Sequence, residues 1–257
     1  MSFSSDWLAL REPLDLAARN PEVRTAFAIR SAQGPHRILD LGCGTGASLR
    51  AIAPHLPLPV HWVLADLDPH LLQEAARRHP EAETQRLDLN DVAALPLVEG
   101  GHITASALFD LCSEEMVQAL IARLSTEGNA LYAALNYDGR VHWSEAHPLD
   151  GAVLGAFNLH QQRDKGFGPA LGPRAGAELA RLAEAAGLHV VRGESLWRMD
   201  ASHADLQRAF LQGMQDAVTE TGEVPDLQDW FAFRQSAVGG QGTCIVGHLD
   251  ILAMPQP

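Results

Sequence analysis

Three alternate glycines stand between a short apolar run and a helical pattern. They are Gly42, Gly44 and Gly46, in the stretch Ile38-Leu39-Asp40-Leu41-Gly42-Cys43-Gly44-Thr45-Gly46. Glycine lets the backbone approach a ligand where a Cβ would collide, and a following helix offers unpaired N–H groups. Such a turn lies at the carboxyl end of a strand, where open α/β sheets bind ligands. We therefore predict a nucleotide-like ligand at this turn.

An acid follows the glycines at the distance that nucleotide-binding sheets use. Asp66 ends the next apolar run, and there it could accept hydrogen bonds from both ribose hydroxyls. A phosphate-binding Walker turn is excluded because no Lys-Ser/Thr follows the glycines. Gly42, Gly44 and Ala47 also satisfy the dinucleotide pattern G-x-G-x-x-G/A, so a nicotinamide cofactor remains an alternative at this point.

Short apolar runs alternate with helical patterns along the chain, which predicts an α/β fold with a mostly parallel sheet. The expected strands are Arg37–Leu41, Val60–Ala65, Thr84–Leu89, Ile103–Ala107, Ala130–Leu135, Leu188–Val191 and Thr243–Ala253. The expected helices include Ala47–Leu56, Pro69–His79, a segment around Val117–Leu124, Gly176–Ala186, Ser202–Glu220 and Asp226–Ser236. Ahead of the first strand, Pro13–Arg30 predicts a helical extension that breaks near Pro21.

The chain divides into an extension and one main domain. Residues 1–35 are expected to form a helical N-terminal extension or lid, and residues 36–253 the ligand-binding domain. Within that domain, residues 136–174 are rich in Gly, Pro, His and aromatic side chains. A stretch of this length inside a compact domain is usually functional, so we predict a substrate lid inserted after the fifth strand.

Composition excludes several classes of protein. The chain has 257 residues, 46% of them hydrophobic and 20% charged, which indicates a globular fold. Its net charge of −13 argues against nucleic acid or an anionic membrane as the main partner. No secretory signal or membrane-spanning stretch is evident. Three cysteines without C-x-x-C spacing fit a reducing compartment, so a cytoplasmic protein is expected, and no zinc signature occurs.

Four motifs in register resemble the class I S-adenosylmethionine-dependent methyltransferases, in particular a bacterial group that acts on small molecules. Leu39–Gly46 fits the first motif residue for residue, and Asp40 before the glycines favours methyltransferases over nicotinamide dehydrogenases. Val63–Pro69 resembles the second motif, Arg86–Asn90 the third and Ile103–Asp110 the fourth. The fourth departs from the family in having His102 where an acid often opens the strand.

The resemblance implies a Rossmann-like, doubly wound sheet of about seven strands, with the last strand antiparallel. It also implies S-adenosylmethionine as the cofactor. Gly42, Gly44 and Gly46 would pass beneath the methionine part, with Cys43 contributing backbone only. Asp40 and Ser106 would orient the methionine amino end. The residues implied for the nucleoside are Asp66 for the ribose, Leu67 as an apolar wall, and Asp88 with the Leu89 backbone for adenine.

In such an enzyme a lone pair of the acceptor attacks the sulfonium methyl carbon in line, so catalysis is mainly proximity, orientation and exclusion of water. A base is needed only if the nucleophile must lose a proton. The candidates for the acceptor end are Asp110, Asn136, Tyr137 and His160. Other residues of the insertion could line or close the acceptor site, and Arg11 and Asp15 could fold over its mouth. A metal is not expected, because the histidines lack ligand spacing.

Methyl transfer to a small molecule is thus the leading hypothesis. A nicotinamide-dependent oxidoreductase on the related sheet is the nearest alternative. A regulatory protein that binds the cofactor without catalysis is a second alternative from another functional class. An RNA-modifying enzyme is disfavoured by the acidic charge and by the lack of an appended basic domain.

Overall fold

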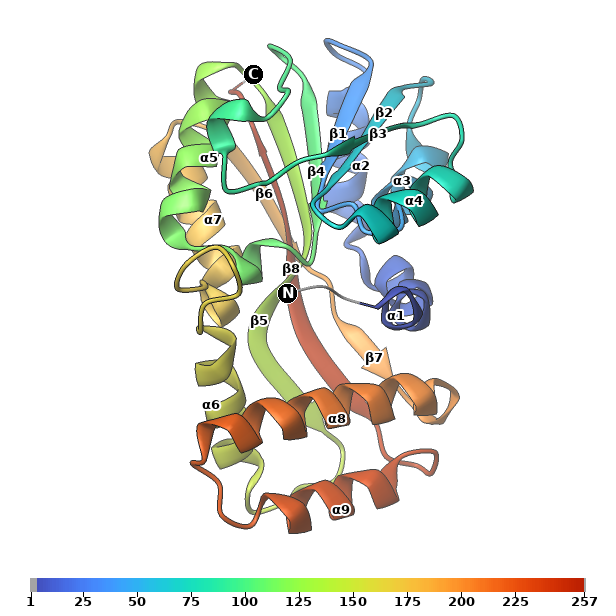
Figure 1. Cartoon of the computed structure of the whole chain (residues 1–257), viewed down its shortest axis with the longest axis vertical. Helices are drawn as coiled ribbons and strands as arrows, with labels where there is room; N and C mark the ends of the chain where they lie inside the picture. Colours follow the sequence, from blue (N-terminus) through green and yellow to red (C-terminus); the bar gives the residue numbers. More distant parts are fainter. Residues whose placement is uncertain (1–3, 257) are drawn as a thin grey trace.

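The computed structural model describes residues 4–256, which form one mixed sheet covered by helices on both faces (Figure 1). Within these residues the sheet has eight strands in the order β3-β2-β1-β4-β5-β8-β6, and β7 pairs with β8. The strands are β1 (Arg37–Leu41), β2 (His61–Asp66), β3 (Glu83–Arg86), β4 (His102–Ser106), β5 (Ala130–Trp143), β6 (His189–Glu194), β7 (Trp197–Met199) and β8 (Cys244–Met254). The first five run parallel, and β8 is antiparallel to β5, β6 and β7.

This topology confirms the predicted doubly wound sheet with an antiparallel last strand. β1 is central and pairs with β2 and β4, which explains its continuous apolar run, since both of its faces are covered. Ile38, Leu39 and Leu41 have at most 1% of their surface exposed. The additional strand β7 was not expected, because it has three residues and its central Arg198 is exposed.

Helices pack on both faces of the sheet. They are α1 (Ser5–Ala18), α2 (Pro21–Ser31), α3 (Ala47–Ile52), α4 (Pro69–Arg78), α5 (Glu114–Thr126), α6 (Asp150–Gln161), α7 (Ala175–Ala185), α8 (Ala204–Thr221) and α9 (Leu227–Ala237). One apolar cluster joins α5 and α7 to the sheet, and another joins α2, α3 and α4 to its other face. Within residues 4–256, none of the helices combines the length and apolar character needed to cross a bilayer.

A third apolar cluster builds a lobe beyond the main sheet, which we call the lower lobe. It joins α1, α6, α8 and α9 to the outer halves of β5 and β8 and to β7. Figure 1 shows α8 and α9 crossing the lower ends of β5 and β8, away from α5 and α7. The first helix of the chain therefore packs with elements from its last third.

Two predicted boundaries were wrong. The segment Asn136–Trp143 was assigned to the lid, but it continues β5. Leu135 has a φ of +57°, and the pairing with β8 shifts register between Ala133 and Asn136. This irregularity lets polar residues follow the apolar run without ending the strand. The N-terminal helix begins at Ser5 rather than at Pro13, which lies inside α1, while the break before Pro21 is confirmed.

Candidate functional site

The glycine turn between β1 and α3 has a left-handed backbone at every alternate residue. Gly42, Gly44 and Gly46 have φ values of +61°, +55° and +85°. Side chains with a Cβ disfavour this region, which explains the three glycines. Gly46 precedes α3, and no side chain caps this end of the helix. The turn therefore leaves backbone N–H groups available to a ligand.

A cavity of about 600 Å³ opens over this turn. Most of the residues predicted to hold the cofactor line it, namely Gly42, Cys43, Gly44, Asp66, Leu67, Asp88, Leu89 and Ser106. They come from the ends of β1, β2 and β4 and from the segment after β3. Because parallel strands end at one edge of a sheet, residues far apart in sequence meet in one cavity.

Asp66 connects the second strand to the glycine turn. Its Oδ2 accepts a hydrogen bond from the Gly44 N–H at 2.9 Å, and its Oδ1 accepts from the Asp68 N–H at 3.0 Å. A carboxylate has about four acceptor sites, so each oxygen can still accept from a further donor. Asp66 is thus placed to hold the turn and a ribose diol at the same time.

Asp88 is tied to the segment after α6. Its Oδ1 accepts from the backbone and side-chain N–H groups of Asn90, both at 3.0 Å. The Asn90 side chain also donates to the carbonyl oxygen of Gly166 at 3.1 Å. Gly166 and Phe167 line the cavity, so this contact fixes part of its wall.

Asp40 and Gly46 lie beneath the cavity rather than among its lining residues. Asp40 is fully buried, its Oδ1 accepts from the Thr104 hydroxyl at 2.7 Å, and its Oδ2 has no partner. Burial raises the pKa of Asp40 to about 6. At Gly46 a Cβ would lie 2.7 Å from the His79 ring, so this glycine also permits close packing.

Helix α1 covers the cavity with Leu8, Arg11 and Asp15. Arg11 forms an ion pair with Asp15 at 2.7 Å and lies over the Trp197 ring, 5.0 Å from its centre. The Trp197 indole N–H donates to Asp15 at 2.9 Å. The extension thus reaches the cavity through Arg11 and Asp15, as expected. Leu8 was missed, although spacings of three and four residues place all three on one helical face.

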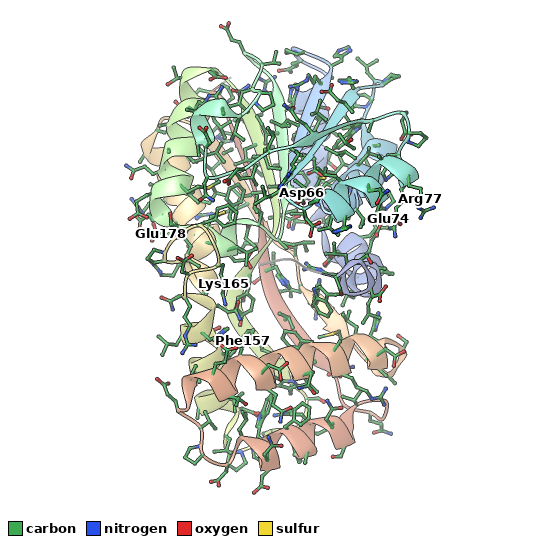
Figure 2. All side chains as sticks on the ribbon, viewed as in Figure 1. Asp66, Glu74, Arg77, Phe157, Lys165 and Glu178 are labelled. Carbon is green, nitrogen blue, oxygen red and sulfur yellow. The ribbon has the colours of Figure 1, made fainter. Side chains whose placement is uncertain are left out.

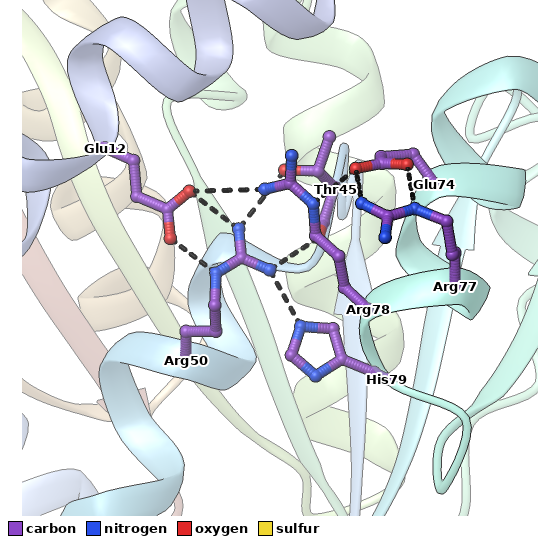
Figure 3. A network of polar contacts seen from close by, with 7 residues as sticks. All are labelled: Glu12, Thr45, Arg50, Glu74, Arg77, Arg78 and His79. Carbon is purple, nitrogen blue, oxygen red and sulfur yellow. Dashed lines mark hydrogen bonds and ion pairs between the residues drawn. The ribbon is translucent and has the colours of Figure 1, made fainter.

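A polar network joins α1 to the glycine turn (Figure 3). The Arg50 guanidinium pairs with Glu12 of α1 and donates to the Thr45 carbonyl at 2.7 Å. It also contacts the His79 ring at 2.7 Å. Arg78 lies 3.9 Å from the same Glu12 carboxylate. Arg50 therefore connects α1 to the glycine turn, two elements that both line the cavity.

We expect Arg50→Ala to loosen α1 over the cavity. The substitution leaves Glu12 without its main partner and frees the Thr45 carbonyl, so the amides of residues 5–18 should exchange hydrogen faster. Hydrogen-exchange mass spectrometry measures this directly. Arg77→Ala is the matched control, because the Arg77 side chain is 70% exposed and pairs only with Glu74. Equal exchange in the two variants would contradict a role for Arg50 in holding α1.

The four candidates for the acceptor end are not among the lining residues of the cavity. Asn136 donates to the carbonyls of Ala133 and Leu249, so its amide supports the irregular pairing of β5. The Tyr137 hydroxyl donates to Asn158 at 2.8 Å. The ring of His160 lies between Glu220 and Lys165.

Asp110 and Asn136 each have a buried side-chain oxygen, Oδ1, with no partner, and of these two residues Asp110 is the one whose side chain can take up a proton. Burial raises the pKa of Asp110 to about 6, and the nearby Arg11 guanidinium partly offsets this. Arg11 itself lines the cavity. Asp110 therefore lies near the cavity, next to the lining residue Leu111 and within electrostatic reach of Arg11.

Several lining residues were not predicted. They are Leu8, Ser48, His70, Leu71 and Leu111. Most of them adjoin a predicted motif residue, so a wider window around each motif would have found them. Among residues 4–256 no group of three or more His, Cys, Asp or Glu side chains could hold a metal ion.

Comparisons with known proteins agree with this geometry. Residues 38–128 match the sequence model of a family described as Methyltransferase domain. A segment of 125 residues is 33% identical to the biotin biosynthesis bifunctional protein BioCD of Bordetella avium, covering 44% of this chain. The match spans about a quarter (24%) of that relative's length.

Two solved structures share the fold. The YcgJ protein of Bacillus subtilis is 13% identical, with a TM-score of 0.51 over 91% of this chain and 99% of its own. A candidate methyltransferase of Bacillus halodurans C-125 is also 13% identical, with a TM-score of 0.51 over 90% and 99% of the two chains. Residues 38–128, which contain the glycine turn, β2, β3 and β4, are thus similar to a methyltransferase domain in sequence, and the sheet has the fold of the two solved structures.

Proposed function

We propose that this protein transfers the methyl group of S-adenosylmethionine to a small-molecule acceptor. The observation that carries the proposal is the shared cavity, where the glycine turn, Asp66 and Asp88 meet under α1. When bound, S-adenosylmethionine supplies an electrophilic methyl carbon. The protein supplies position and a covered site, which are the main sources of rate in such a displacement.

Individual residues would then have distinct roles. The glycine turn and Ser106 hold the methionine end, and the unpartnered Oδ2 of Asp40 adds negative charge beneath it. Asp66 accepts from the ribose, and Asp88 with the Leu89 backbone binds adenine against Leu67. Leu8, Arg11 and Asp15 of α1 exclude water from above.

Asp110 is our candidate for a general base. Its raised pKa, about 6, leaves the carboxylate charged at neutral pH yet basic enough to take a proton from an O–H or N–H acceptor. Its buried Oδ1 has no hydrogen-bond partner, and the adjoining Leu111 lines the cavity. Burial, followed by the charges of Asp138 and Asp110, raises the pKa of the Tyr137 hydroxyl, which favours its neutral, donating form.

The alternatives fit the cavity less well. A nicotinamide-dependent oxidoreductase would not need Asp40 before the glycines or the acid after β3. A regulatory protein would bind the cofactor without a candidate base such as Asp110. The net charge of −13 disfavours nucleic acid as the acceptor, and the free, buried Cys43, Cys112 and Cys244 fit a cytoplasmic location.

The test is transfer of label to an unknown acceptor. The protein is incubated with methyl-labelled S-adenosylmethionine and a bacterial metabolite extract, and the products are identified by mass spectrometry. We expect a small molecule that gains the labelled methyl group only when the protein is present. Bound cofactor with no labelled product across extracts would favour the regulatory alternative.

A further inference from the structure

Lys165 is a buried cation in the wall of the cavity. Only 8% of its surface is exposed, although it belongs to the connection between α6 and α7. Figure 2 shows Lys165 on the side of the molecule away from Glu74 and Arg77. Lysine is almost never buried this far unless its charge is paired.

The connection is built so that Lys165 points inward. The neighbouring Asp164 is exposed, and its Oδ1 accepts from the N–H groups of Gly166 and Gly168 at 2.7 and 3.1 Å. Gly166 also binds Asn90 through its carbonyl oxygen. These bonds hold the backbone that follows the lysine and engage Oδ1 of Asp164.

His160 contacts the Lys165 ammonium group, and Glu220 holds the His160 ring. Glu220 lies 3.0 Å from Nε2 of His160, while Nδ1 of the same ring lies 3.5 Å from the Lys165 Nζ. An Nε2–H donated to Glu220 leaves Nδ1 as an acceptor for the lysine. His160 is thus a positioning residue for Lys165.

Among the residues that the structure describes, no carboxylate forms an ion pair with Lys165. Burial lowers the pKa of Lys165, and among residues 4–256 Glu220 is the one carboxylate that acts to raise it. Glu220 is already paired with His160 and Arg163. The His160 contact uses one of three ammonium N–H groups. The other two remain for a group in the cavity.

We propose that the methyl acceptor carries an acidic group, a carboxylate or a phosphate, that Lys165 binds. This inference rests on the proposed function. The side chains of Leu108, Leu111 and Phe167 line the same cavity, so the remainder of the acceptor has an apolar or aromatic body. Lys165 therefore selects acceptors by charge, while the apolar side chains bind the body.

The test compares matched probes on the full chain saturated with S-adenosylhomocysteine. Phenylacetate and phenylacetamide share one shape and differ in charge, and phenyl phosphate distinguishes a phosphate site from a carboxylate site. We expect one of the two acids to bind at least about tenfold tighter than the amide by calorimetry. Equal binding of acid and amide, or no binding of any probe, would overturn the proposal.

Variants assign the preference to Lys165. Lys165→Met should abolish the tenfold difference, and Lys165→Arg should retain most of it, because the charge remains. A preference that persists in Lys165→Met overturns the assignment. The melting temperature of each variant shows that the fold is intact.

A second arm asks whether Lys165 binds the cofactor's own carboxylate instead. S-adenosylhomocysteine has that carboxylate and 5′-methylthioadenosine lacks it. The affinities of these two nucleosides are therefore compared in the wild type and in Lys165→Met. We expect neither to change by more than about twofold. A selective loss of S-adenosylhomocysteine affinity would overturn the acceptor assignment. Failure of the wild type to bind S-adenosylhomocysteine would instead contradict the proposed function itself.

Discussion

Asp66→Ala is expected to weaken S-adenosylmethionine binding about 10- to 100-fold. The carboxylate has two tasks, because it accepts from the Gly44 and Asp68 N–H groups and is placed to accept from the ribose. Hydrogen bonds to charged groups contribute about 1.5–3 kcal/mol each, which corresponds to this loss. Calorimetric titration of the variant measures it.

The matched control for this substitution is Asp205→Ala. It removes the same charge from a carboxylate on α8 that is 87% exposed. We expect its cofactor affinity to equal that of the wild type. A folded Asp66→Ala variant that binds with wild-type affinity would remove Asp66 from the site and with it the ribose assignment.

Asp110→Asn is expected to reduce kcat by about 10²- to 10⁴-fold while leaving cofactor affinity nearly unchanged. This range is typical of removing a general base. A base must be unprotonated to act, so kcat of the wild type should fall as the pH drops through about 6, near the pKa of Asp110. With saturating cofactor and the acceptor found by the transfer assay, the pH profile of the variant should lack that inflection.

The pH dependence of stability distinguishes a general base at Asp110 from a residue that only supports the fold. Burial raises the pKa of Asp110 from 3.8 to about 6, so the folded state binds this proton more tightly than the unfolded state. The resulting stabilisation is complete below pH 4 and is lost as the pH rises through 6. At pH 8 the charged carboxylate thus costs on the order of 2–3 kcal/mol, and Asp110→Asn should melt no lower than the wild type. A variant with unchanged kcat would make Asp110 a bystander.

The central sheet could be predicted because the residues within and just after each of its first strands already indicate a buried strand. β1 is a continuous apolar run before a glycine turn, and β2, β3 and β4 each end at or near an acid of the motifs, namely Asp66, Asp88 and Asp110. The lower lobe could not be predicted, because Leu14 of α1 packs in one cluster with Trp197 and Trp230, far along the chain. β5 was predicted too short because the backbone irregularity at Leu135 has no signature in the sequence.

The cofactor end and the acceptor end of the site also differ in how far they could be predicted from the sequence. The residues predicted for the cofactor adjoin the ends of parallel strands, so their meeting place follows from topology, and eight of the ten line the cavity. The acceptor end depends on tertiary contacts instead. His160 was a candidate catalyst from its residue type, but its ring contacts Lys165, five residues away, through the bend that follows α6.

The most direct measurement of the central claim is a calorimetric titration of the wild-type protein with four ligands. They are S-adenosylmethionine, S-adenosylhomocysteine, NADH and NADPH. Our account predicts saturable, one-site binding of both sulfur nucleosides and at least about 100-fold weaker binding of both nicotinamide cofactors. Tight binding of NADH or NADPH with no heat from either sulfur nucleoside would contradict it.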